Sequence, residues 1–309
     1  MNRIWSTIFI IVLLLAFIGY IIFDLVLKSP VKQVTSEGDT ITSVNDNWDI
    51  EKIFNPGHQG LCAVAVSESG NIILGGKSFL SCYDSSYNLI WEFKPDSEIV
   101  AIASFSGKTF AASGSTVLIF NDKGLKVNEI GSFNENAIIT SLSVNSKYVA
   151  IADADSKSIY IADHQGELKY LINNPDEPFI IPSPYFDVAL GESDTIYIAN
   201  TGKRRIEKRK TDGTLLAWYG EEGMAPEYFS GCCNPAHFAL SGQGFVTAEK
   251  GINRIKILDR EGKYIEMVSS ENNFLAPLPL DIAVSSDCSI IYGAYKGDSR
   301  LYVFKRKQL

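Results

Sequence analysis

Short apolar segments alternate with polar turns along most of the chain, and the same order returns six times. Each copy has a short apolar strand, a Gly or polar turn, a second apolar strand, a third β-rich strand, and a turn containing Asp, Asn or Gly. Short runs of β-branched and aromatic residues bounded by such turns are typical of β-strands. The turn glycines Gly124, Gly166, Gly213 and Gly262 are separated by 42, 47 and 49 residues. Self-similarity at this spacing predicts a repeat architecture.

The spacing leaves room for four short antiparallel strands in each copy. One such sheet cannot bury both of its faces, whereas a ring of sheets packs each face against a neighbour and leaves no long open edge. The sixth copy stops after its third strand at 301–304, and residues 48–54 (WDIEKIF) alternate correctly to supply the missing fourth strand. The sequence therefore predicts an all-β fold over residues 47–309, a six-bladed β-propeller closed by strand 48–54.

The chain begins with a long apolar segment. Residues 4–23 (IWSTIFIIVLLLAFIGYIIF) carry no charge, and a helix of that length spans roughly 30 Å, the hydrocarbon thickness of a bilayer. A cleavable signal peptide has a shorter apolar region, about 7–15 residues, followed by a small-x-small site, which is missing after Tyr20. We therefore expect one transmembrane anchor helix in residues 1–28, a membrane contact through residues 4–23, and a polar linker in residues 29–46.

The charges around the segment bear on its orientation. Arg3 and the amino terminus on one side nearly balance Lys28 and Lys32 on the other, but a three-residue tail is easily left inside. We expect a single-pass protein of the cell membrane whose C-terminal domain is extracytoplasmic (periplasmic). The formal net charge of −8 argues against a nucleic-acid partner. We interpret the basic run 203–210 (KRRIEKRK) as a solvated outer strand, with a patch for a partner or a lipid headgroup as the alternative.

Two of the copies carry a family resemblance. Residues 198–220 (IANTGKRRIEKRKTDGTLLAWYG) resemble the core of an NHL repeat, with a small polar turn, Arg-Ile on the third strand and Asp-Gly before the fourth, and residues 246–268 repeat this pattern. The segment 229–240 (FSGCCNPAHFAL) is similar to one in bacterial NHL-repeat proteins, many of which are membrane-anchored or exported. The resemblance covers roughly residues 48–309. It implies a fold and a compartment and says little about chemistry, because propellers host many unrelated activities.

Propeller ligands usually lie where the inner strands of neighbouring blades converge on the central channel. When the inner strands are aligned on a shared small residue, the position two residues earlier holds Ala63, Ile102, Ser141, Asp187, His237 and Asp281. Three consecutive blades thus present Asp, His and Asp at one level. We expect Asp187, His237 and Asp281, together with Asn234 and Ser141, to form a binding site at the channel mouth.

Two interpretations of this set stay open. Two carboxylates beside an imidazole can bind a cation or raise the pKa of the histidine. Calcium is the candidate cation, because lactonase-like and gluconolactonase-like six-bladed hydrolases bind it in this region through oxygen ligands, and Asp187, Asp281 and Asn234 could imitate part of that set. No Glu of the first blade matches, and Cys62 stands near its place. Alternatively, each Asp satisfies turn amides and the His binds a backbone carbonyl.

Two of the five cysteines, Cys232 and Cys233, are adjacent. In an oxidising compartment such a pair can close a vicinal disulfide, and in reduced form it offers two thiolates to a soft metal such as Cu(I) or zinc. We interpret Cys232 and Cys233 as a structural pair, either a disulfide or buried thiols. A platform for a ligand or cofactor and a metal or redox site are the alternatives.

The strong sequence signals of an enzyme are absent, since the chain has no G-x-S-x-G elbow, no Cys-x-x-Cys pair and no His-Glu-x-x-His motif. The sequence therefore favours a non-enzymatic function. We expect a membrane-anchored, extracytoplasmic NHL-repeat propeller that acts as a scaffold for a protein, peptide or glycan and needs no cofactor. The alternatives are a calcium-dependent propeller hydrolase or lyase and an accessory protein of an exported redox system.

Overall fold

The computed structural model describes residues 13–15, 17, 47–173, 175–270, 274 and 278–307. The chain forms two compact units, Met1–Ser43 and Val44–Leu309. In the first unit, the described residues 13–15 and 17 are helical. Within the described residues, no helix has both the length and the apolar character needed to cross a membrane. Apart from those four residues, the predicted anchor over 4–23 and the whole linker over 29–46 lie outside the described part of the chain.

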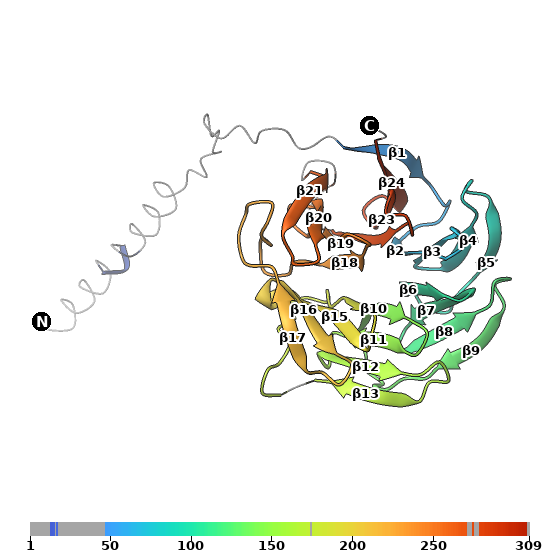
Figure 1. Cartoon of the computed structure of the whole chain (residues 1–309), viewed down its shortest axis with the longest axis horizontal. Coiled ribbons are helices and arrows are strands. Elements are labelled where there is room, and N and C mark those ends of the chain that lie inside the picture. Colours follow the sequence, from blue (N-terminus) through green and yellow to red (C-terminus); the bar gives the residue numbers. More distant parts are fainter. Residues whose placement is uncertain are drawn as a thin grey trace, which may run out of the picture. The chain divides into compact units, whose positions relative to one another are not determined.

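The second unit is a ring of six four-stranded antiparallel sheets, the blades (Figure 1). Blade 1 consists of β2 (Leu61–Val66), β3 (Ile72–Gly76), β4 (Phe79–Tyr83) and β5 (Leu89–Phe93). Blade 2 consists of β6 (Ile99–Phe105), β7 (Lys108–Ser113), β8 (Thr116–Phe120) and β9 (Lys126–Ile130). Blade 3 consists of β10 (Ile139–Val144), β11 (Val149–Asp153), β12 (Ser158–Ala162) and β13 (Leu168–Ile172).

The other three blades follow the same order. Blade 4 consists of β14 (Val188–Leu190), β15 (Thr195–Asn200), β16 (Arg205–Lys210) and β17 (Leu215–Tyr219), with a short 3-10 turn at Thr201–Lys203. Blade 5 consists of β18 (His237–Leu240), β19 (Gly244–Ala248), β20 (Ile255–Asp259) and β21 (Tyr264–Ser269). Blade 6 consists of β22 (Leu280–Val284), β23 (Ile290–Tyr295), β24 (Arg300–Arg306) and β1 (Trp48–Phe54). The first strands of the six blades contact one another in a closed circle around the axis.

Strand β1 closes the ring and coincides with the predicted closing strand. It pairs antiparallel with β24, so that Trp48 lies opposite Arg306 and Phe54 opposite Leu301. Trp48 is buried, and the guanidinium of Arg306 lies 5.0 Å from the centroid of its ring. The two ends of the propeller are therefore held in one sheet, and the six-bladed all-β fold predicted from the sequence is confirmed.

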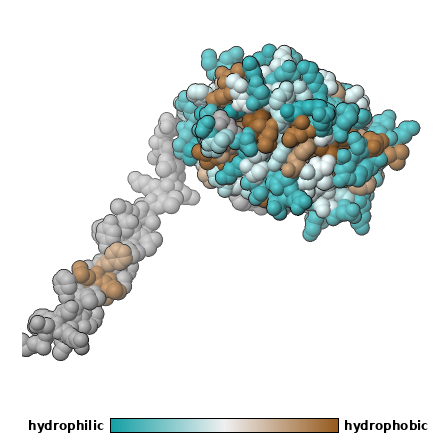
Figure 2. Space-filling model, turned by 90° about the horizontal axis from the view of Figure 1, so that it is seen from below, coloured by the Kyte–Doolittle hydropathy of each residue, from teal (hydrophilic) through white to brown (hydrophobic). Residues whose placement is uncertain are grey.

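The second strands of the blades show why the ring is stable. Strands β3, β11 and β19 are buried along their whole length, since the neighbouring blades cover both of their faces. At Gly75 a Cβ atom would lie 2.6 Å from Cγ2 of Ile99 in the next blade, so a side chain there would push the blades apart. The fourth strands instead expose apolar side chains at the perimeter, among them Val127 and Trp218, and the side view in Figure 2 shows apolar patches between hydrophilic ones.

The antiparallel order of the strands gives the propeller two different faces. The first-to-second and third-to-fourth strand turns lie at one end of the strands, which we call the turn face. The second-to-third strand turns and the connections between blades lie at the other end, which we call the loop face. The two longest connections with described residues are 175–187, which leads into blade 4, and 220–236, which leads into blade 5. Both segments therefore lie on the loop face, where each inner strand begins.

The interpretation of residues 203–210 as a solvated outer strand is wrong. Residues 205–210 form β16, the third strand of blade 4. Glu207 is fully buried and Arg209 is only 1% exposed. The carboxylate of Glu207 accepts hydrogen bonds from Arg205 and Arg209 on either side of it, and this pairing offsets the cost of removing the charges from water.

Candidate functional site

Asp187 joins three blades at the axis of the propeller. It directly precedes β14 of blade 4, and its Oδ1 accepts hydrogen bonds from the Ser141 hydroxyl of blade 3 and from the amide of Val188. Its Oδ2 accepts a hydrogen bond from the amide of Phe238 in blade 5, over 2.7 Å. Ser141 and Asp187 therefore act together as a clasp between neighbouring inner strands.

Asp281 makes the corresponding link between the last blade and the first. Its Oδ2 accepts a hydrogen bond from the amide of Val64 in β2, over 2.8 Å. The Nδ1 atom of His237 lies 3.5 Å from Oδ1 of Asp281 and 3.9 Å from Oδ2 of Asp187. The structure thus brings the predicted Asp, His and Asp side chains together at one level of the channel. Their role in binding a ligand stays a prediction.

Burial governs the protonation of the two carboxyl groups. It raises the pKa of Asp187 above its ordinary value, although His237 and the hydrogen-bond donors work against the shift. It raises the pKa of Asp281 to about 6; His237 opposes this shift and the charge of Asp187 adds to it. The carboxyl group of Asp281 is therefore mostly neutral in mildly acidic solution and mostly charged at neutral pH.

The hydrogen bond from the Val64 amide to Asp281 predicts different effects for two substitutions of Asp281. Asp281→Ala should lower the free energy of unfolding by about 1–3 kcal/mol near neutral pH, because the Val64 amide loses its acceptor in a buried place. Asp281→Asn keeps an acceptor oxygen and carries no charge to desolvate, so it should cost about 1 kcal/mol or less. Urea unfolding of the full chain measures both values. Equal losses of unfolding free energy for the two variants would contradict a stabilising role of this hydrogen bond.

The same pair tests the pKa of Asp281. Because the pKa is higher in the folded chain, the stability that Asp281 contributes is fully present below the ordinary value of 3.8 and is lost as pH rises through about 6. Asp281→Asn should remove this loss, so its stability relative to the parent chain should rise between those two pH values. A constant difference would show that Asp281 titrates normally.

A small chamber lies on the axis next to these side chains. Its volume is about 70 Å³, and inner strands of all six blades line it, with Ser141, Asp187 and Asp281 among the polar residues. Pockets that hold organic ligands usually measure about 300–1,000 Å³. The chamber therefore has room for a few water molecules or an ion, and not for a lactone or sugar substrate.

Asn234 does not join the aspartates at the channel in any described contact. It is buried in the loop before β18, where its amide nitrogen donates to the carbonyl oxygens of Ser230 and Lys250. Its Oδ1 accepts a hydrogen bond from the amide of Lys250, over 2.7 Å. Among the described residues, no group of three or more His, Cys, Asp or Glu side chains could hold a metal ion. The Oδ1 atom of Asn234 thus already accepts a hydrogen bond within the loop, and a role of Asn234 as a ligand-binding residue stays a prediction.

Cys232 and Cys233 are free thiols in the structure, with sulfur atoms 3.0 Å apart. Cys232 is exposed and Cys233 is buried. Burial, and then the contact with Cys232, raises the pKa of Cys233 above its ordinary value. The vicinal disulfide stays a prediction. Next to the pair, the ammonium of Lys250 lies 4.9 Å from the ring centroid of Tyr185, and that ring makes an edge contact with His237.

A buried charge cluster that the sequence did not reveal holds the cysteine loop in place. The carboxylate of Glu249, which directly follows β19, pairs with Arg254 over 2.5 Å and with Lys256 over 3.0 Å, and none of these side chains is more than 7% exposed. Arg254 also donates to the carbonyl oxygens of Met224, Ala225 and Tyr228, and Lys256 donates to that of Tyr228. The charges thereby bind the backbone of residues 224–228.

A second cluster repeats this arrangement in blade 4. Glu207 accepts hydrogen bonds from Arg205, Arg209 and Asn200. Asn200 in turn accepts a hydrogen bond from the amide of Ile180, over 3.0 Å, and the guanidinium of Arg209 lies 5.2 Å from the ring centroid of Phe179. The loop that leads into blade 4 is therefore held as well. The two clusters share one sequence feature, an Arg-Ile pair at 205–206 and again at 254–255, and this repeat could have pointed to a second cluster once the first was known.

Comparisons with known proteins identify the fold and no family. No protein-family model matches the chain, and no curated protein is similar to it in sequence. Among solved structures, the chain is similar to the WD40 domain of Pan2 from Neurospora crassa, with a TM-score of 0.58 and 11% sequence identity. The similarity covers 85% of this chain and 96% of that domain. At this identity the likeness shows a shared β-propeller fold.

Proposed function

We propose that the protein is a non-catalytic NHL-type propeller that is anchored in a membrane and presents its loop face, outside the cytoplasm, to a protein or peptide partner. The observation that carries the proposal is the pair of buried charge clusters beneath the two long loops. Their main contacts outside the clusters are with loop backbone and loop side chains.

Buried ion pairs contribute little net stability, because the cost of desolvating them is close to the energy that they return. Holding a loop in one conformation, by contrast, removes the entropy cost that a partner would otherwise meet on binding. The loop 220–236 exposes Met224 and Cys232 above this rigid base. A preorganised, exposed loop next to the channel mouth is well suited to recognition.

The channel itself favours binding over catalysis. Both carboxylates are used as acceptors for backbone amides of neighbouring blades, and the chamber beside them has a volume of only about 70 Å³. A hydrolase that used either aspartate as a general acid or base would need that carboxyl group to be free and next to space for its substrate. The Arg-Ile pairs and the sequence around Cys232 support the NHL assignment, and the apolar segment 4–23 supports the membrane anchor.

Crosslinking in intact cells tests the partner and the compartment together. Met224, which is 70% exposed, is changed to Cys in a Cys232→Ser chain, and a membrane-impermeant maleimide that carries a photo-crosslinker is added from outside. We expect labelling without lysis and, after illumination, a discrete adduct with another protein. Lys123→Cys in the same background is the matched control, because Lys123 lies exposed in a turn of the opposite face.

The possible results separate the parts of the proposal. Labelling of position 224 only after lysis would contradict the extracytoplasmic location. Labelling without an adduct, or equal adducts from positions 224 and 123, would contradict recognition by the loop face.

A further inference from the structure

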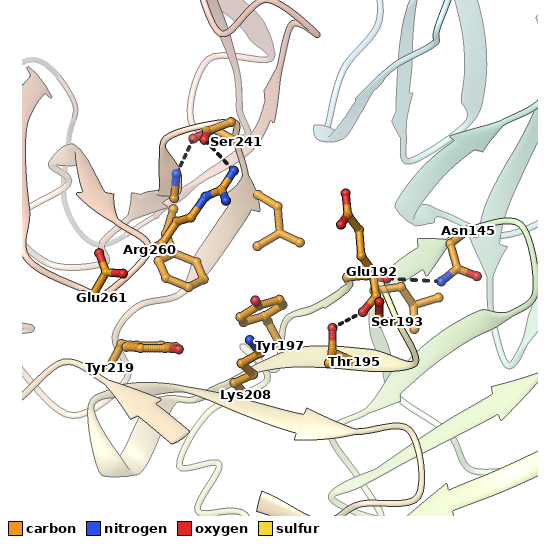
Figure 3. A pocket seen from close by; sticks show the side chains of 16 residues that line it. Asn145, Glu192, Ser193, Thr195, Tyr197, Lys208, Tyr219, Ser241, Arg260 and Glu261 are labelled. Carbon is orange, nitrogen blue, oxygen red and sulfur yellow. Dashed lines mark hydrogen bonds between the residues drawn. The ribbon is translucent and has the colours of Figure 1, made fainter. Parts of the chain in front are cut away.

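A large cavity lies on the turn face, away from the channel mouth. It has a volume of about 830 Å³ and lies between blades 4 and 5. Its wall includes the first turn of each of these blades, around Gly191 and Gly242, the last residue of β17, and the turn that follows β20. This volume falls within the range of about 300–1,000 Å³ that is typical of ligand pockets. In Figure 3, Arg260 and Glu192 approach the pocket from opposite sides, with Tyr197 and Lys208 between them.

Three aromatic rings form a fixed apolar base for the pocket. Phe245 is buried, and the rings of Tyr197 and Tyr219 each pack against it with centroids 5.4 Å away. Both tyrosines are partly exposed. The ammonium of Lys208 lies 5.7 Å from the ring centroid of Tyr197. Because Phe245 holds both tyrosine rings, the partly exposed ring surfaces are already in place when a ligand arrives.

Several polar groups around these rings have free hydrogen-bonding capacity within the described part of the chain. The hydroxyls of Tyr197 and Tyr219, the ammonium of Lys208 and the carboxylates of Glu192 and Glu261 make no hydrogen bond or ion pair there, and Arg260 donates only to the carbonyl of Gly242. Donors and acceptors are therefore both available. Two cationic and two anionic side chains offset one another, so the pocket has no net charge that would attract an anion.

We propose that this pocket binds a neutral oligosaccharide. The flat faces of sugar rings are apolar and can stack on tyrosine rings, and each sugar hydroxyl both donates and accepts, as the mixture of Lys, Tyr and Glu groups requires. This site is independent of the proposed recognition by the loop face.

Titration calorimetry of the purified full chain, in a buffer without glycoside detergents, tests the assignment with maltotetraose, cellotetraose and tetra-N-acetylchitotetraose. We expect saturable binding of at least one of them. Tyr219→Ala should weaken it about tenfold or more through loss of ring stacking, and Glu192→Ala should also weaken it. Tyr170→Ala is the matched control, since Tyr170 is a partly exposed tyrosine on β13 of blade 3, outside the pocket. If Tyr219→Ala fails to fold, Glu192→Ala decides.

Three results would overturn the proposal. The first is no saturable binding of any of the three tetrasaccharides. The second is binding that both pocket variants retain, which would place the sugar elsewhere. The third is binding of tetragalacturonate alone that disappears at high salt, which would show that the pocket selects anions. None of these results would bear on the loop-face crosslinks, so the two proposals fail separately.

Discussion

Removal of residues 47–54 should lower the free energy of unfolding by about 3–5 kcal/mol or more, the range measured when a buried aromatic side chain is lost from a core. The deletion removes β1, including the buried Trp48, and leaves β24 as an open edge. It also removes Phe54, which packs against Tyr83 and Tyr87 of blade 1. Thermal unfolding of the full chain, followed by circular dichroism, measures the loss.

The control deletes a segment of the same length, residues 33–40, from the predicted linker. This change shortens the linker and keeps β1, so it should leave the melting temperature nearly unchanged. A similar melting temperature for both deletions would mean that the pairing of β1 with β24 adds little to the ring. The single substitution Trp48→Ala should give a smaller loss than the deletion, because it preserves the backbone hydrogen bonds of β1.

The ring could be predicted from the sequence because its elements depend on local pattern. Each strand is short, is bounded by turn residues, and recurs at a regular spacing, and the surplus strand at 48–54 matched the one missing from the last copy. It could also be predicted that Asp187, His237 and Asp281 lie at the same height along the propeller axis, since the first strands of all blades run in the same direction around that axis. A shared register on those strands places their side chains close together.

The contacts of the loops could not be predicted in the same way. Asn234 stands three residues before His237 in the sequence, but its side chain is bound to Ser230 and Lys250, and that choice depends on how residues 220–236 fold. The charged strand β16 looks like a solvated strand, because alternating charged residues are the same pattern whether they face water or a buried partner. Only the three-dimensional position of Glu207 between two arginines distinguishes the cases.

The pocket of the turn face was missed for a related reason. Tyr197 and Tyr219 belong to different strands, and Phe245 belongs to a different blade. Each of them alone reads as an ordinary aromatic residue of a strand. Their common feature is a shared contact, which sequence spacing within one repeat does not show.

Glu249→Ala should lower the free energy of unfolding by about 3–5 kcal/mol, because Arg254 and Lys256 would then be buried without their carboxylate. The effect should also reach the cysteine loop, since both cations bind its backbone. We therefore expect the buried thiol of Cys233 to react faster with a maleimide in the variant than in the parent chain. Glu135→Ala changes an exposed carboxylate of another connection and should stay within about 0.5 kcal/mol of the parent.

Lys256→Met separates the charge of this cluster from its packing. Burial lowers the pKa of Lys256 to about 8 from the ordinary 10.5, against the attraction of Glu249. Between those pH values the unfolded chain holds more protons than the folded chain, so the parent gains stability as pH rises through this range. Met keeps the length of the side chain and carries no charge, and replacing buried charge with apolar volume is often neutral or stabilising. The stability of Lys256→Met relative to the parent should therefore be highest at neutral pH and fall above about pH 8, and a difference that does not change with pH would contradict the lowered pKa.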